Sequence, residues 1–283
     1  MKIKKLISAL VLGSMLVGLS GCNITDFSAE NLLRPPKAVG DEAEIEQLIA
    51  KTADSGYTLK YPKNGKFRSA IIMTDLDGND SNEAVAFFRN SAETSSVHML
   101  VMYSKDNSWE IASDNIFETT DIDSVDFADL TGNGKAEIIV NSTTYTPNVG
   151  KLSCYSYSEG KTNEVGSGQS CSSFVTGDFD NDGTSEIMSL VLYTTENEAL
   201  ASMLDYNEDS KSLYAKAMAN MDPNVVKYKN IAVTKLDNDI TGIVVDGTSA
   251  NEVTNTQVIF YSRDLAILRN PLFKEKAKNI TRR

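Results

Sequence analysis

The sequence is poor in the residues on which most catalytic centres depend. Among its 283 residues there are one histidine (His98), one tryptophan and three cysteines. A single histidine leaves almost no material for a histidine-based metal centre or a Ser-His-Asp triad. No G-x-x-x-x-G-K-[ST] motif is present, and no G-x-G-x-x-G motif precedes a helical pattern. The sequence therefore favours a protein that is not an enzyme.

Positive charge is also scarce. The chain has 27 Lys and Arg against 39 Asp and Glu, which gives a net charge of −12. Phosphate contacts need Lys and Arg, so the composition argues against nucleic acid as a partner. It is compatible with bound divalent cations, which would cancel part of the charge. With only 6 prolines and 41% hydrophobic residues, the chain has the composition of a folded protein.

The only long apolar run lies at the N-terminus. Residues 1–21 combine three lysines with an apolar stretch that is too short to span a bilayer comfortably, the layout of a secretory signal peptide. This segment ends in Leu19-Ser20-Gly21-Cys22, which resembles the lipobox of bacterial lipoproteins. The resemblance implies cleavage before Cys22, lipidation of its sulfur and anchoring at the extracytoplasmic face of the cell membrane. The alternative is an ordinary signal peptide with Cys22 at its end.

Loss of the signal peptide would remove three lysines and no acid, which changes the net charge from −12 to −15. Two cysteines then remain, Cys154 and Cys171. An exported protein can form a disulfide between them, but they could equally be small core residues on neighbouring strands. The sequence leaves both interpretations open.

The pattern changes twice after Cys22. Residues 22–40 are a polar tether that contains Pro35-Pro36, where a helix cannot continue. In residues 41–56, apolar positions at helical spacing follow an acidic first turn, which predicts a short amphipathic helix. Short strand patterns separated by turn residues occupy residues 57–270.

A motif of alternating acidic residues recurs in these strand patterns. It begins at Asp75, Asp129, Asp178 and Lys235, with spacings of 54, 49 and 57 residues. In every unit an apolar strand enters the motif, a second leaves it, and two more follow. Four strands in about fifty residues are typical of a β-propeller blade.

We therefore expect an all-β fold of about four blades, each of four antiparallel strands, near residues 65–116, 122–167, 172–220 and 225–269. Residues 271–283 would be a tail or the start of a truncated blade. Four blades are the small end of the propeller range, so we expect the ring to be incomplete, the alternative being a closed four-bladed ring.

The motif has the form D-x-D-x-[DN]-G-x-x-E. Side chains at positions 1, 3 and 5, the carbonyl of position 7 and the carboxylate at position 9 can surround one ion with oxygen, which suits Ca²⁺. An EF-hand differs, because its last acid stands at position 12 and helices flank it. The motif resembles the FG-GAP or VCBS-type repeats of integrin-α-like β-propellers over about residues 65–265, and the resemblance implies a calcium loop between the first two strands of each blade. The ligands implied are Asp75, Asp77, Asn79, Ser81 and Glu83 in the first loop, Asp129, Thr131, Asn133, Lys135 and Glu137 in the second, and Asp178, Asp180, Asp182, Thr184 and Glu186 in the third.

The loops are not equally complete. The third has the most acids, the first has Asp80 in place of the glycine, and the second has only two acids and should bind weakly. The fourth has Lys235 and Ile243 in its end positions and should be a plain turn. The alternative for all of them is an ordinary polar turn without metal.

Together these features predict an exported, lipid-anchored surface lipoprotein whose repeats are stabilised by bound calcium. It would act as a non-enzymatic module that binds a protein or a glycan. The competing hypothesis is an envelope enzyme that acts on polysaccharide, with catalytic residues in unidentified loops or in a missing part.

Overall fold

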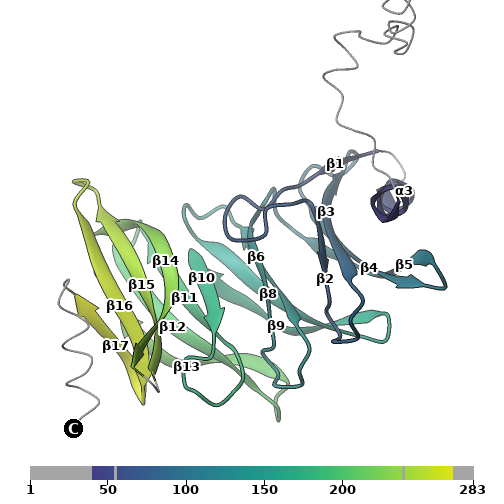
Figure 1. Ribbon diagram of the computed structural model, residues 1–283. Coiled ribbons are helices and arrows are strands. Elements are labelled where there is room, and N and C mark those ends of the chain that lie inside the picture. The colour runs from purple at the N-terminus through teal and green to yellow at the C-terminus, as the bar shows by residue number, and fades with distance from the viewer. Residues whose placement is uncertain (1–39, 54–55, 238–239, 270–283) are drawn as a thin grey trace, which may run out of the picture. The chain divides into compact units, whose positions relative to one another are not determined.

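The computed structural model describes residues 40–53, 56–237 and 240–269 (Figure 1). The predicted signal peptide, Cys22, the tether up to residue 39 and the tail lie outside the described residues. Contacts divide the chain into residues 1–43 and residues 44–283, and all four sheets belong to the second unit.

The described residues form four antiparallel sheets and one helix, which confirms the predicted all-β fold of four-stranded blades. In the second, third and fourth sheets, strands that follow one another in the sequence pair with one another. The helix is α3 (Asp41–Ala53). The first sheet holds β1 (Tyr57–Leu59), β2 (Ile71–Thr74), β3 (Glu83–Asn90), β4 (Val97–Lys105) and β5 (Ser108–Phe117). The second holds β6 (Ile122–Ala128), β7 (Glu137–Thr143), β8 (Gly150–Ser158) and β9 (Lys161–Cys171). The third holds β10 (Ser173–Gly177), β11 (Glu186–Tyr193), β12 (Glu198–Asn207) and β13 (Ser212–Asn220), and the fourth holds β14 (Val225–Asp237), β15 (Ile240–Ser249), β16 (Thr254–Ser262) and β17 (Asp264–Arg269).

The first sheet differs from the other three by one strand. Both β1 and β2 pair with β3, so its outer edge is formed in two pieces. The segment between them leaves the first sheet, and the backbone N–H of Asn64 donates to the carbonyl of Asp123 on β6, 2.7 Å away. Strand β1 was not expected as a separate element, because three residues are too few to show an alternating pattern.

Apolar residues fill the spaces between neighbouring sheets. Strands β3, β7 and β11 are buried along almost their whole length, because other elements cover both faces of their sheets. One core joins the first sheet to the second, around Phe87 and Ile138. Another joins the second to the third, around Ile139 and Ile187, and a third core joins the third sheet to the fourth.

Helix α3 packs on the remaining face of the first sheet. Its buried residues Ile45, Ile49 and Ala53 share a core with Phe88 of β3 and Trp109 of β5. Their spacing of four residues places them on one side of the helix, as its sequence predicts. The helix ends at Ala53, three residues before the predicted limit.

The two remaining cysteines are both free and both buried, so the disulfide considered from the sequence is absent. Strand register explains why. Cys171 pairs with Gly150, whereas Cys154 lies four residues further along β8. At about 3.3 Å per residue, this offset separates the two positions by roughly 13 Å. A disulfide needs Cα atoms within about 7 Å.

Each sheet packs against the next one in chain order. Strand β5 of the first sheet contacts β9 of the second, and β6 of the second contacts β10 of the third. In turn, β10 contacts β14 of the fourth sheet and β13 contacts β17. Within residues 40–53, 56–237 and 240–269, no strand of the first sheet is in extensive contact with a strand of the fourth. None of the helices in these ranges is long and apolar enough to cross a membrane.

Candidate metal centres

The acidic motifs form the hairpin loops between the first two long strands of the first three sheets, β2–β3, β6–β7 and β10–β11. We number the nine residues of each loop from 1 to 9. The first loop is then Asp75–Glu83, the second Asp129–Glu137 and the third Asp178–Glu186.

The three loops share their internal hydrogen bonds. The aspartate at position 1 accepts from the backbone N–H of position 6, at 2.9, 2.8 and 3.2 Å in loop order. The side chain at position 5 accepts from the N–H of position 7, at 2.7, 2.8 and 2.8 Å. These bonds fix positions 1 and 5 on the inside of a tight turn, as the repeat pattern predicts.

Two residues in each loop adopt a left-handed backbone. Position 6 was expected to do so, and φ is 65° at Asp80, 78° at Gly134 and 94° at Gly183. Position 4 does so as well, at Gly78, Gly132 and Asn181. Gly and Asn are the residues that tolerate this conformation best. The recurrence of Gly or Asn at position 4 indicates this second left-handed residue, which the motif as written did not predict.

Position 9 is a buried glutamate in every loop. Glu83, Glu137 and Glu186 are at most 3% exposed, although each opens a strand next to a polar loop. One carboxylate oxygen of each accepts from the backbone N–H of position 2, at 2.8, 2.8 and 2.7 Å. Burial raises the pKa of all three carboxyls, and that of Glu186 reaches about 8. An ionised carboxylate in this place therefore needs further positive charge.

The third loop gathers the most acids. One ligand oxygen each of Asp178, Asp180, Asp182 and Glu186 lies within 4.8 Å of the others. Oδ1 of Asp178 and Oε1 of Glu186 are buried and have no hydrogen-bond partner in the described part of the chain. Buried carboxylate oxygens without a donor are costly, and a bound cation would satisfy them. The residues of this loop therefore fit a metal ion.

The first loop has the same arrangement with one acid fewer. Asp75, Asp77 and Glu83 bring their ligand oxygens together, and Oδ1 of Asp77 is buried without a hydrogen-bond partner among the described residues. Asp80 accommodates the left-handed conformation that glycine takes in the other loops, so its presence does not change the turn. This cluster also could hold a metal ion.

The second loop satisfies its glutamate without an ion. The Thr131 hydroxyl donates to Oε1 of Glu137 at 3.2 Å, while the backbone N–H groups of Leu130 and Thr131 donate to Oε2. With only Asp129 and Glu137 as acids, the loop forms no cluster of three such ligands. That this loop would bind a metal ion only weakly stays a prediction.

The fourth motif does not form a comparable loop. Strand β14 extends through it, and Lys235 pairs with Thr241 on β15. Asp237 of β14 pairs with Ile240 of β15. Lys235 and Ile243 therefore lie on paired strands, where they serve as sheet residues.

Lys216 is a part of the third loop's surroundings that the sequence did not indicate. It lies on β13, the last strand of the same sheet, and its ammonium group contacts Asp180 and lies 2.7 Å from Oδ2 of Asp205. These two carboxylates raise the pKa of Lys216, although partial burial opposes the effect. No sequence pattern connects Asp180 in the loop with Lys216, which lies 36 positions away on β13.

The three loops are also bonded to one another. The N–H of Ala136, at position 8 of the second loop, donates to the carbonyl of Leu76 in the first, at 3.1 Å. Ser185, at position 8 of the third loop, donates in the same way to the carbonyl of Asp129, at 2.9 Å. The loops therefore lie side by side, and an ion in one of them would stiffen its neighbour.

The remaining predicted ligands lie where the repeat places them. Ser81, Lys135 and Thr184 are at position 7, and their N–H groups bond to the position 5 side chains. The Thr184 hydroxyl also donates to Asp182 at 2.6 Å, and this bond lowers the pKa of Asp182.

No protein-family model matches the chain, and no curated protein matches it.

Proposed function

We propose that the protein is an exported, lipid-anchored binding module whose β-propeller repeats are held by Ca²⁺. The observation that carries the calcium assignment is Glu186. Its side chain is completely buried, one of its oxygens has no donor, and three aspartates surround it. A bound cation would reduce the repulsion among these four groups and also fill the missing contact.

The kind of ligand supports Ca²⁺ over other cations. All the candidate ligands are oxygens, and no histidine or cysteine belongs to either cluster. Oxygen-only sets suit Ca²⁺ and Mg²⁺, and Ca²⁺ accepts more ligands in a less regular geometry than Mg²⁺ does. Outside the cell, calcium would be available to such a site.

The role of the ion would be structural. Each loop connects two strands of one sheet, and an ion that binds positions 1, 3, 5 and 9 holds the two strand ends together. A ligand that binds only the native state stabilises it by mass action. The repeats resemble FG-GAP or VCBS-type propeller repeats, in which loops of this form hold calcium.

The anchor is supported by the sequence alone. The order of lysines, apolar run, small residues and Cys22 resembles a bacterial lipobox, and it implies attachment through a lipid at Cys22. The lipid would hold the repeats at the extracytoplasmic face of the membrane.

Binding is favoured over catalysis because the acidic clusters of the described residues belong to the proposed calcium loops. They are therefore explained by metal binding and do not single out a catalytic pair. The single histidine, His98, is buried and lies 2.9 Å from Asp114, and no serine or cysteine of the described residues is bonded to it. A screen of the purified protein against glycans, which records both binding and hydrolysis with and without EDTA, tests this function. Binding without hydrolysis would support it, and calcium-dependent hydrolysis would replace it with the enzyme hypothesis.

A further inference from the structure

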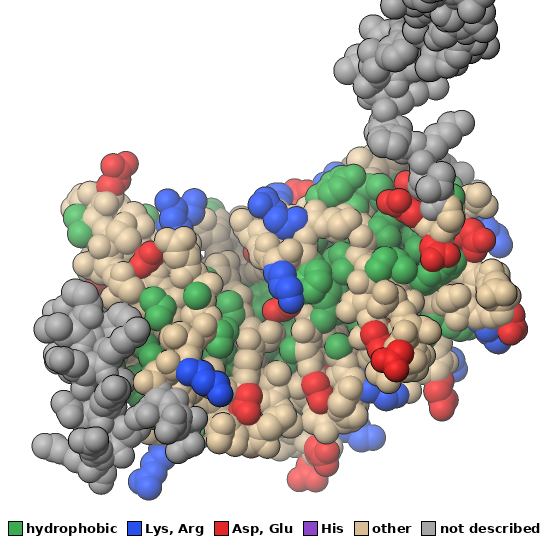
Figure 2. Space-filling view, viewed as in Figure 1, with side chains coloured by type: hydrophobic (Ala, Val, Ile, Leu, Met, Phe, Trp, Pro, Cys, Tyr) green, Lys and Arg blue, Asp and Glu red, His purple; other side chains and the backbone are tan. Residues whose placement is uncertain are grey.

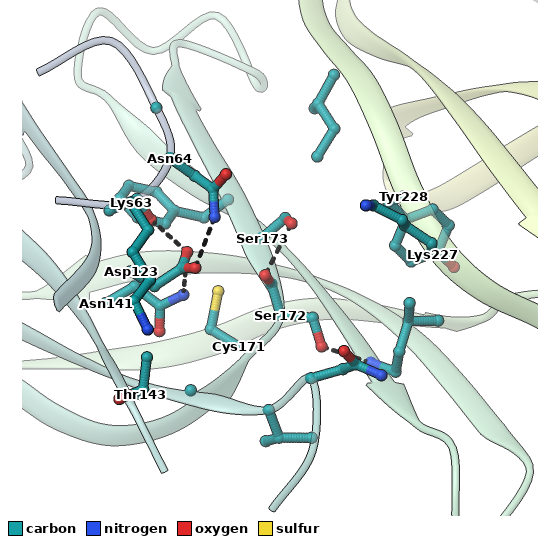
Figure 3. A pocket seen from close by; sticks show the side chains of 18 of the residues that line it. Lys63, Asn64, Asp123, Asn141, Thr143, Cys171, Ser172, Ser173, Lys227 and Tyr228 are labelled. Atoms are coloured by element: carbon teal, nitrogen blue, oxygen red, sulfur yellow. Dashed lines mark hydrogen bonds between the residues drawn. The ribbon is translucent and has the colours of Figure 1, made fainter. Parts of the chain in front are cut away.

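A cavity of about 860 Å³ lies on the side of the sheets formed by their first strands. Strands β6, β10 and β14 line it, together with the segment 63–66 that crosses from the first sheet. Figure 3 shows Asn64, Asp123 and Asn141 on one wall, Lys227 on the opposite wall, and Ser172 and Ser173 between them. The volume lies in the range that binds small organic ligands.

The charge of this cavity is opposite to that of the chain. Four lysines line it, against the two aspartates Asp123 and Asp126, in a protein of net charge −12. On the face seen in Figure 2, acidic and basic side chains are interspersed. The lysines are Lys66, Lys227, Lys229 and Lys63, of which Lys63 already pairs with Asp121 at 3.1 Å. A concave site with an excess of one sign attracts ligands of the other sign.

The two aspartates are already engaged. Asp123 accepts from the side chains of Asn64 at 2.8 Å and Asn141 at 3.3 Å, and Asp126 accepts from Thr176 at 2.9 Å. By contrast, Lys227 and Lys229 have no ion-pair partner within the described ranges, and both are exposed. Their ammonium groups are therefore available to an anion that enters the cavity.

About half of the remaining lining residues carry hydroxyl or amide groups, and most of the others are apolar. Asn141 lies at the base and is only 1% exposed, and its side-chain oxygen Oδ1 has no donor in the described part of the chain. An added methyl group at Gly150 would lie 2.2 Å from that oxygen, so the backbone must approach closely there. The other hydroxyl and amide residues of the lining include Asn64, Thr146, Asn148, Ser172, Ser173 and Asn230.

We propose that this cavity binds an acidic oligosaccharide, a glycan whose sugars carry carboxylates. The lysines would pair with the carboxylates, and the hydroxyl and amide side chains would bond to the sugar hydroxyls. This inference rests on the proposed function, because it assigns a ligand to the binding module.

Other anions fit the cavity less well. Inorganic phosphate would leave most of the volume empty. A nucleotide would need an aromatic surface for its base, but the aromatic residues of the lining, Phe174 and Tyr228, are half-buried and buried. A chain of several sugars makes use of both the spread of the lysines and the many hydroxyl groups.

The test is a calorimetric titration of the full-length protein in detergent, at saturating calcium, with hexagalacturonate. The fully methyl-esterified hexasaccharide is the matched uncharged probe, and hexamannuronate is a second acidic one. The variant Lys227→Ala/Lys229→Ala removes the two unpaired lysines. The control Lys105→Ala/Lys161→Ala makes the same change of charge at two exposed lysines outside the cavity.

We expect at least one acidic hexasaccharide to bind, and the cavity variant to weaken that binding by about tenfold, since it removes two charge-assisted contacts. The control variant distinguishes a local site from a general attraction of the acidic ligand to positive charge on the protein, because only a local site loses more affinity in the cavity variant. The esterified probe shows whether the carboxylates of the ligand are needed. Calcium captured by the ligand would affect all variants equally, so it cannot produce the difference.

Two results would overturn the proposal: no binding of either acidic hexasaccharide, or equal binding by the cavity variant and the control. Melting curves of the same samples with calcium and with EDTA separate this failure from failure of the proposed function. If the protein responds to calcium but binds no uronate, the proposal of calcium-held repeats stands and only the proposed ligand is rejected.

Discussion

The ammonium group of Lys216 lies 2.7 Å from Oδ2 of Asp205 and also contacts Asp180, which is at position 3 of the third loop. A positive group of the protein itself therefore occupies part of the space around the candidate metal site. It neutralises two carboxylates in the absence of an ion, and it opposes a divalent cation that would share Asp180.

Replacement of Lys216 should therefore strengthen metal binding. We expect Lys216→Met to raise the calcium affinity of the third loop several-fold, because the competing charge is removed while the aliphatic packing is kept. Without calcium the same variant should melt at a lower temperature than the wild type, since Asp180 and Asp205 lose their partner. A calcium titration checks the first effect, with Lys161→Met as the control, and weaker binding by Lys216→Met would contradict it.

The contact between the second and third loops should be sensitive to a single methyl group. A Cβ at Gly132 would lie 2.6 Å from Cγ2 of Thr184, whereas a Cβ at Gly134 meets nothing within 4 Å. Both glycines have positive φ, so alanine at either position costs about 1–2 kcal/mol of backbone strain. Gly132→Ala should be the more destabilising of the two. Equal unfolding free energies in denaturant would show that the loops do not pack as described.

Asp121 should contribute a pH-dependent part of the stability. The Lys60 and Lys63 ammonium groups lie 2.6 and 3.1 Å from its carboxylate. Partial burial raises the pKa of Asp121, but the hydrogen bonds to the two lysines outweigh it and hold the pKa below its usual value. The stabilisation is therefore complete above the pKa of the unfolded chain and is lost as the pH falls through the lower folded value.

Asp121→Asn should remove this contribution, about 1 kcal/mol for a partly exposed pair of ion contacts. Its unfolding free energy should be lower than that of the wild type at pH 7, and the difference should shrink toward pH 3. Denaturant titrations at the two pH values measure it. A difference that stays constant with pH would mean that charge on Asp121 is not its source.

The lipid anchor makes a separate prediction. Cys22→Ser should move the protein from the membrane fraction to the soluble fraction after expression in bacteria, because a serine cannot take the thioether-linked lipid. Immunoblots of the fractions measure the change. Unchanged membrane partition of Cys22→Ser would contradict lipidation, and Cys154→Ser serves as the control for loss of a cysteine.

The loops and the strands around them could be predicted because the residues that determine them are close in sequence. Asp178, Gly183 and Glu186 occupy one nine-residue turn, and local hydrogen bonds set its shape. Lys216 could not be found in this way, because strand pairing brings it to the loop. The same holds for the cysteines, whose separation depends on the register of β8 and β9. The cavity, too, combines side chains from three sheets, and no single segment reveals it.

The central claim, that calcium holds the loops, is tested most directly by thermal melting with excess Ca²⁺ and with EDTA. At calcium near one hundred times Kd, a site specific to the native state adds about 2.7 kcal/mol, or roughly 5 °C or more in melting temperature. Asp178→Ala/Asp182→Ala should lose most of this shift, while Glu208→Ala/Asp209→Ala, which changes two exposed acids in the β12–β13 turn, should keep it. Identical melting curves of the wild type with Ca²⁺ and with EDTA would contradict the account.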